Sequence, residues 1–188
     1  MKKTNLTIVL FHIFVFISAQ EKSETFKIKL PSKVLIQGTS TLHDWESIVE
    51  KTDAQLTTNN LNNEQIETLN VTVEVLSIKS GKNLMDKLTY KALKADDYPN
   101  ITFVFKKGEI IKEDAAHVDI KLIGDLMIAG VTKSVAVKTK INKQGKPIVL
   151  KGTHMLKMTD FGIDPPKALL GTIKTGDEIT IEFNLTFE

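Results

Sequence analysis

The feature that most constrains this fold is an unbroken alternation of apolar and polar side chains near the end of the chain. Residues 179–187 read Ile-Thr-Ile-Glu-Phe-Asn-Leu-Thr-Phe. Successive side chains of a β-strand point to opposite faces, so this strand has one protected face and one face in water. The same period recurs in residues 118–128 and 135–141. The alternation predicts an antiparallel sheet whose protected face encloses either packed side chains or a ligand.

Strand-like segments follow one another along the chain and are separated by short turns that contain glycine. We expect strands at residues 26–30, 34–37, 41–56, 70–78, 101–106, 109–111, 116–128, 134–142, 148–159 and 178–187. Residues 59–67 are polar, with room for one helical turn. Residues 84–95 have the apolar spacing of a helix, with Asn83 as the expected N-cap and Pro99 beyond its end. An antiparallel sheet of eight or more strands predicts a barrel or a sandwich, and closure removes exposed edges.

The N-terminal residues have the composition of a signal peptide. Lys2 and Lys3 precede an apolar run at residues 6–17, and Ala19 is a small residue suited to cleavage. The run is shorter than the roughly 20 residues that a membrane helix needs, and a retained anchor is the alternative. We therefore expect cleavage after Ala19 and a single domain at residues 20–188. The protein would then be periplasmic or secreted, with no stable membrane anchor.

The charge and cysteine content argue against binding to nucleic acid or anionic lipid and against thiol chemistry. Residues 1–19 hold two of the 25 basic residues and none of the 23 acidic ones, so residues 20–188 have a formal net charge of zero. This balance gives no long-range attraction to nucleic acid or anionic lipid. Every basic residue is a lysine, so the guanidinium fork that usually clamps phosphate is missing. The chain has no cysteine, which excludes disulfides and attachment of a lipid through a thiol.

Side chains suited to catalysis or metal binding are few and scattered. After residue 19 the histidines are His43, His117 and His154, which are too dispersed to predict a metal site. We expect His43 to make a structural hydrogen bond in a turn, and His154 to be a satisfied core histidine rather than a ligand contact. Asp160 and Asp164 have the spacing of a cap or a solvated face rather than of a glycosidase pair. No nucleophile elbow or phosphate-binding loop occurs, so the sequence favours no enzyme class, cofactor or metal.

Trp45 is the single tryptophan and follows a small, polar segment that begins at Gly38. We expect the indole to plug the end of a barrel, with contact to a ligand as the alternative. Met85 and Met158 add soft side chains that serve equally as core filler and as pocket lining.

Five sequence blocks, in order, resemble the YceI-like family of exported bacterial proteins. They are residues 38–45, 80–87, 93–103, 124–133 and 158–163, and the resemblance extends over about residues 25–187. It implies an all-β, lipocalin-like barrel of eight antiparallel strands with one short inserted helix, often paired as a homodimer. It also implies an elongated apolar cavity for a long-chain polyisoprenoid, quinone-like or fatty-acid-derived ligand. A barrel of about eight strands has room for packed side chains or one slim ligand.

The resemblance gives candidate ligand-binding residues but no catalytic residues. The candidates are the apolar side chains Trp45, Leu84, Met85, Leu88, Leu122, Leu126, Ile128, Leu156, Met158, Phe161 and Leu170. Tyr90, Lys91 and Asp160 are candidates to meet a polar head group. The expected function is that of a non-catalytic binding or carrier protein. The alternatives are a hydrolase-type enzyme for a hydrophobic or sugar substrate, and a structural or stress-related module with a filled barrel.

Overall fold

The computed structural model describes residues 23–59, 66–143 and 146–188, and most of them lie in β-strands. The strands are β1 (Glu24–Ser40), β2 (Trp45–Val49), β3 (Thr52–Thr58), β4 (Ile66–Glu74), β5 (Ile78–Lys79), β6 (Asn100–Glu113), β7 (His117–Ile128), β8 (Val131–Asn142), β9 (Ile148–Lys157), β10 (Lys167–Ala168) and β11 (Ile173–Phe187). The helical segments are α1 (Asn83–Ala92) and the 3-10 turns η1 (Val75–Ser77), η2 (Met158–Phe161) and η3 (Leu169–Gly171). The predicted signal peptide and the middle of the polar segment at residues 59–67 lie outside the described residues.

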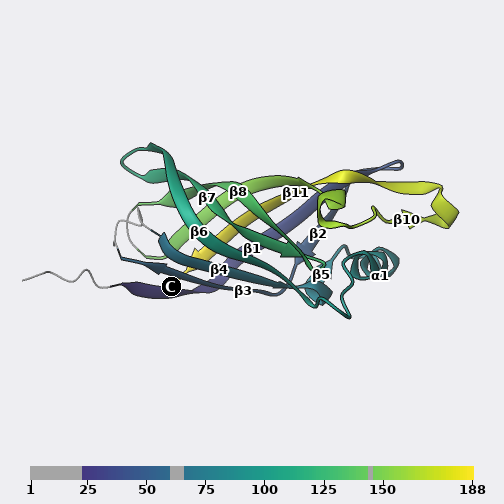
Figure 1. The fold of residues 1–188 in the computed structure, drawn as a ribbon, viewed down its shortest axis with the longest axis horizontal. Helices are drawn as coiled ribbons and strands as arrows, with labels where there is room; N and C mark the ends of the chain where they lie inside the picture. Colours follow the sequence, from purple (N-terminus) through teal and green to yellow (C-terminus); the bar gives the residue numbers. More distant parts are fainter. Residues whose placement is uncertain (1–22, 60–65, 144–145) are drawn as a thin grey trace, which may run out of the picture.

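Eight of the strands close into a barrel. Their hydrogen-bonded order is β11-β9-β8-β7-β6-β4-β3-β1, and β1 pairs with β11 to complete the circle. Every one of these pairings is antiparallel. The barrel is elongated, with α1 and β10 at one end and the C-terminus at the other (Figure 1). We call these the mouth end and the closed end. The predicted lipocalin-like barrel with one inserted helix is confirmed.

Two walls of the barrel are broken where the sequence predicts continuous strands. The expected strand at residues 41–56 divides into β2 and β3, which both pair with β1. The expected strand at residues 70–78 divides into β4 and β5, with η1 between them. Backbone hydrogen bonds join the segments at these two breaks. Glu50 N donates to Ser77 O at 3.0 Å, and Glu74 N donates to Lys51 O at 3.3 Å. Backbone groups that leave the ladder are therefore still paired.

Two other pairs of predicted strands are single long strands. Residues 26–30 and 34–37 both belong to β1, whose register with β11 shifts between Lys29 and Lys33. The Ser32 hydroxyl accepts the Thr186 N–H at 2.9 Å inside this irregularity, which keeps the two strands joined. Residues 101–106 and 109–111 both belong to β6, which shifts register twice against β7. Such bulges bend a strand without ending it.

The helix α1 begins one residue before the predicted range and ends three residues earlier. Lys82 holds the N-cap position and makes no side-chain cap bond, so the expectation of Asn83 as the N-cap is wrong. Asp86 in the first turn instead accepts the backbone N–H and the hydroxyl of Ser80, at 2.8 and 2.6 Å. Burial opposes ionisation of Asp86, but these hydrogen bonds outweigh it and hold the pKa below its ordinary value. Lys94 adopts a φ of 52° just beyond the helix, where the chain turns back toward β6.

Buried side chains form two clusters, one toward each end of the barrel. The cluster at the closed end includes Phe26, Leu56, Val118, Ile141, Ile148, Leu150 and Phe187. The cluster at the mouth end includes Leu126, Ile128, Leu156, Met158, Phe161 and Ile163. Both clusters include residues that also border a cavity, among them Leu150 in the first and Leu156 in the second.

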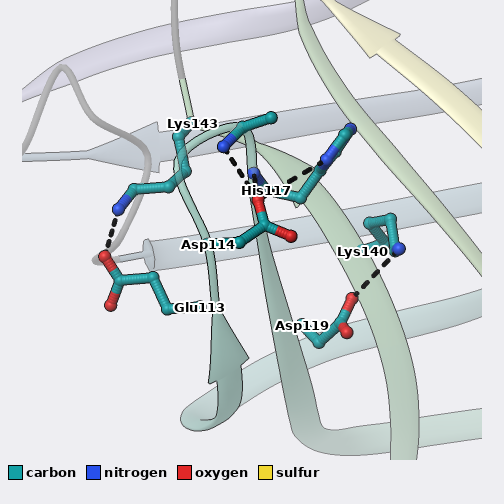
Figure 2. Close-up of polar contacts among 7 residues, drawn as sticks. Glu113, Asp114, His117, Asp119, Lys140 and Lys143 are labelled. Atoms are coloured by element: carbon teal, nitrogen blue, oxygen red, sulfur yellow. Dashed lines mark hydrogen bonds and ion pairs between the residues drawn. The ribbon is translucent and has the colours of Figure 1, made fainter.

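The hairpin between β6 and β7 carries polar contacts on the outside of the closed end. Figure 2 shows contacts between Lys143 and Glu113, between His117 and Asp114, and between Lys140 and Asp119. Asp114 also accepts the backbone N–H groups of Ala116 and His117 at 2.8 Å each, which lowers the pKa of its carboxyl. These exposed contacts fix the turn and lie away from the barrel interior.

Candidate functional site

The barrel interior contains two adjoining cavities. The cavity nearer α1, here called the mouth cavity, has a volume of about 380 Å³. The second, here called the inner cavity, has a volume of about 140 Å³ and extends toward the closed end. Ile36, Ile101 and Ile181 line both cavities, so the two adjoin at the level of these residues. Together they form one elongated space with mostly apolar walls.

The strand with the clearest alternation, β11, lines this space along most of its length. Ile179 borders the mouth cavity, and Ile181 borders both cavities. Phe183 and Leu185 border the inner cavity, whereas Phe187 is completely buried in the closed-end cluster. The inner face of β11 therefore borders the cavities along most of its length and joins the packed core at Phe187.

The helix α1 forms one side of the mouth. Leu84, Met85 and Leu88 line the mouth cavity, as the sequence predicts, and Ala92 joins them one turn further on. Leu84 is largely exposed because it lies at the opening. The opposite side is made by the β10 segment, through Pro166, Lys167 and Ala168.

Tyr90 fastens α1 to the barrel rather than facing the cavity. Its hydroxyl donates toward the Leu76 and Ile78 carbonyls, each at 3.0 Å, and accepts a hydrogen bond from Lys79 Nζ at 2.7 Å. The hydrogen bond that Lys79 donates to Tyr90 raises the pKa of the Lys79 ammonium. Tyr90 and Lys91 line neither cavity. The bonds at the tip of the Tyr90 side chain therefore tie α1 to the segment that contains Leu76 and Ile78.

Asp160, the third residue expected near a head group, also lies outside both cavities. Its carboxylate pairs with Lys133 Nζ at 3.5 Å on the surface. The polar side chains at the mouth cavity are a different set, which sequence reasoning missed: Ser40, Ser47, Lys82, Thr89, Lys167 and Thr175, together with His43. The spacing of these residues along the chain gives no signal that they meet, because three distant parts of the chain, residues 40–47, 82–89 and 167–175, bring them together.

Trp45 lies in the wall of the mouth cavity. Its ring packs directly over Gly38, where an added Cβ would lie 2.4 Å from Trp45 Cζ2. Its indole N–H donates to the Thr39 carbonyl at 3.0 Å. The indole therefore lines the mouth cavity at the end of the barrel, and its contact with a ligand stays a prediction.

The remaining candidates on the strands divide between the two cavities. Leu122 and Leu126 line the inner cavity. Ile128, Leu156 and Met158 line the mouth cavity. The positions in β7 and β9 follow from the period of two, which places alternate side chains on the inner face, whereas Met158 is the first residue of η2.

Two candidates line neither cavity. Phe161 is buried in the mouth-end cluster, where it packs behind the cavity wall. Leu170 is fully exposed, and the expectation that it faces the barrel interior is wrong. The chain reverses at this point through η3, with φ of 47° at Leu169 and 55° at Leu170, and both side chains point to solvent.

The histidines occupy three separate environments. His43 lies at the mouth, and its Nδ1 is 2.7 Å from the Asp44 carbonyl, which confirms the expected structural hydrogen bond. His117 is on the outer hairpin beside Asp114. His154 lines the inner cavity, and its ring nitrogens have no hydrogen-bond partner among the described residues. It is therefore not the satisfied core histidine that the sequence predicts, and burial lowers the pKa of its imidazole.

Within the described residues, no group of three or more His, Cys, Asp or Glu side chains is arranged to hold a metal ion.

The same part of the chain contains no helix that is both long and apolar enough to cross a membrane.

Known proteins with this architecture were found by comparison. BcnA from Burkholderia cenocepacia is 20% identical, with a TM-score of 0.66 over 82% of this chain and 95% of its own. A polyisoprenoid binding domain from Saccharophagus degradans, implicated in plant cell wall breakdown, is 12% identical, with a TM-score of 0.62 over 87% of this chain and 97% of its own. A YceI protein from Campylobacter jejuni is 22% identical, with a TM-score of 0.58 over 99% of this chain and 98% of its own. No curated protein sequence matches the chain.

The structural likenesses establish a shared fold, and the sequence itself provides the family. The family model for the YceI-like domain matches residues 20–187, which span the whole barrel and both cavities. The chain therefore belongs to the YceI-like family.

Proposed function

We propose that this protein is a non-catalytic binding protein that carries a long-chain apolar ligand inside its barrel. The observation that carries the proposal is the elongated apolar space that runs from α1 toward the closed end. The ligand classes that fit it are polyisoprenoid, quinone-like and fatty-acid-derived chains. The structural neighbour from Saccharophagus degradans, which is described as a polyisoprenoid binding domain, supports the same ligand class.

The chemistry of the walls provides enough affinity without a strong polar contact. Each buried CH₂ contributes about 0.8 kcal/mol, and association costs about 4–15 kcal/mol. A chain of several isoprene units exceeds that cost if most of it is enclosed. The depth of the two cavities then selects for chain length, because a longer chain would leave apolar carbon in water.

The proposal includes export and pairing. The signal-peptide pattern of residues 1–19 supports a periplasmic or secreted protein, and N-terminal sequencing of the mature protein tests cleavage after Ala19. The homodimer implied by the family resemblance is tested by sedimentation of the purified protein.

The alternatives lack a supporting observation. An enzyme needs converging ionisable groups, but His43 is at the mouth, His154 is at the inner cavity and Asp160 pairs with Lys133 outside both. A filled barrel would leave no space between α1 and the closed-end cluster.

The proposal is tested by native mass spectrometry of protein purified without detergent, followed by extraction and identification of bound lipid. We expect a bound long-chain molecule in the wild-type protein. Ala92→Trp adds a large ring to the mouth cavity and should abolish binding with the fold retained. Lys87→Trp, on the exposed side of the same helix, is the matched control and should bind normally. An empty wild-type protein that takes up neither isoprenoids nor fatty acids would overturn the proposal.

A further inference from the structure

One ring of inward-facing residues in the barrel wall contains two polar side chains. The register of the sheet places Ser47 opposite Ile36, Ile36 opposite Ile181, and Ile181 opposite His154. These four residues belong to β2, β1, β11 and β9, which are consecutive around the barrel. The two isoleucines line both cavities, so the row lies where the cavities adjoin.

Ser47 is a buried polar group without a protein partner. The residue is only 3% exposed and lines the mouth cavity. Its hydroxyl makes no hydrogen bond to any of the described residues, unlike Ser77, whose hydroxyl bonds to the Glu74 carbonyl at 2.7 Å. The Ser47 hydroxyl lies in the wall of the mouth cavity rather than in packed core, so a hydrogen-bonding group inside that cavity can reach it.

His154, at the other end of the row, also has no hydrogen-bond partner among the described residues. Its imidazole borders the inner cavity, where no other titratable side chain is found among the described lining residues. The outward-facing neighbours in the sheet, such as Thr153 beside Glu182, point away from the ring. Burial favours the neutral form of His154, which offers one N–H donor and one nitrogen acceptor.

We propose that Ser47 and His154 form a head-group site that holds a neutral, hydrogen-bonding group of the ligand inside the barrel. This proposal rests on the carrier function proposed above and specifies its ligand as an apolar chain that bears an alcohol, carbonyl or amide. Adjacent strands are about 4.8 Å apart, so the two side chains are about 14 Å apart along the curved wall and approach the head group from two sides. The larger mouth cavity then receives the chain.

A charged head group does not fit this position. No lysine lines the inner cavity, and the lysines of the mouth cavity, Lys82 and Lys167, come from the α1 and β10 segments at the opening. A carboxylate or diphosphate at the row would be buried without a counter-charge. Such a ligand would have to keep its head at the opening, with only its chain at Ser47 and His154.

Three ligands with the same number of carbons separate these possibilities: the alcohol geranylgeraniol, its diphosphate and the hydrocarbon phytane. Binding is followed by the fluorescence of Trp45, the only tryptophan, and confirmed by native mass spectrometry. We expect the wild-type protein to bind the alcohol more tightly than the hydrocarbon or the diphosphate. Ser47→Ala and His154→Phe should each weaken binding of the alcohol about threefold to tenfold, the effect of one hydrogen bond, and leave the hydrocarbon within about twofold.

Two outward-facing neighbours, changed as Glu46→Gln and Thr153→Val, are matched controls and should leave all three affinities unchanged. His154→Gln keeps hydrogen-bonding capacity and should retain more alcohol affinity than His154→Phe. Equal losses for alcohol and hydrocarbon, no loss for either, or tightest binding of the diphosphate would overturn the head-group site. If none of the three chains binds, the carrier function itself fails.

Discussion

The two ends of the barrel are built from the same strands but have opposite interiors. At the closed end Phe187, Phe26 and Ile148 fill the space between the walls and are almost completely buried. At the mouth end the same inner face, continued by Ile181 and Ile179, borders a cavity instead. The alternation of apolar and polar side chains is unbroken from Ile179 to Phe187, across both regions. A one-sided strand therefore identifies the inner face, while neighbouring elements decide whether that face meets protein or empty space.

The two interiors differ because different elements and side chains lie at the two ends of the barrel. Large aromatic side chains converge at the closed end, where the outer hairpin adds only surface contacts (Figure 2). At the mouth end lie α1 and the β10 segment (Figure 1), and side chains of both line the mouth cavity. One end thus packs apolar side chains together, and the other encloses the mouth cavity, where we propose that the ligand binds.

Paired truncations at the two ends of β11 should give the largest contrast. Phe187→Ala removes a fully buried ring and should cost about 3–5 kcal/mol of unfolding free energy. Ile179→Ala should cost less than about 2 kcal/mol, because one side of the isoleucine already faces the cavity. Urea unfolding of the ligand-free protein measures both. Equal losses would show that the mouth end is packed as tightly as the closed end.

Glycine substitutions sharpen the same comparison. Gly38→Ala places a Cβ 2.4 Å from a ring atom of Trp45, so the indole must leave its place in the cavity wall. We expect a loss of about 1–3 kcal/mol, a shifted tryptophan emission and weaker ligand binding. Gly108→Ala, in contrast, places a Cβ 2.6 Å from the terminal methyl of Ile120, the far end of a side chain that lies away from the mouth cavity. Its binding should remain normal, and a shared loss of binding would contradict a local role for Gly38.

Acid should destabilise the barrel interior and the outer hairpin of the closed end in different pH ranges. His154 has a lowered pKa, so below about pH 6.5 the unfolded chain takes up a proton that the folded protein does not. The unfolding free energy therefore decreases as the pH is lowered. Asp114 at the closed end also has a lowered pKa, but its contribution is present at neutral pH and is lost below about pH 3.8. Urea unfolding across this range should show that His154→Phe removes the first decline and Asp114→Asn reduces the second. A wild-type curve that is flat between about pH 7 and pH 5 would exclude a buried neutral histidine.

The sequence predicts the barrel well because its signal is local. Alternation in β7, β8, β9 and β11 identifies inner faces, and Leu156 and Met158 consequently lie at the cavity as expected. The breaks between β2 and β3 and between β4 and β5 have no such signal, because they depend on hydrogen bonds between segments far apart in the chain.

The site is less predictable because distant segments form it. Ser47 is in phase with Trp45 and Val49, so its inward direction is readable, but the absence of a partner for its hydroxyl appears only in three dimensions. Tyr90 is on the predicted helix, yet its bonds to the Leu76 and Ile78 carbonyls depend on how that helix docks.

The smallest effect is expected at Leu170, which is near the mouth but outside the cavity. Its φ of 55° is unfavourable for a side chain with a Cβ, and its side chain is fully exposed. Leu170→Gly should therefore leave ligand affinity unchanged and raise the unfolding free energy by at most about 1 kcal/mol, since glycine adopts this backbone freely but also gains entropy when unfolded. Thermal unfolding and the tryptophan binding assay measure the two quantities. A clear loss of affinity would place Leu170 against the ligand and extend the mouth beyond α1 and β10.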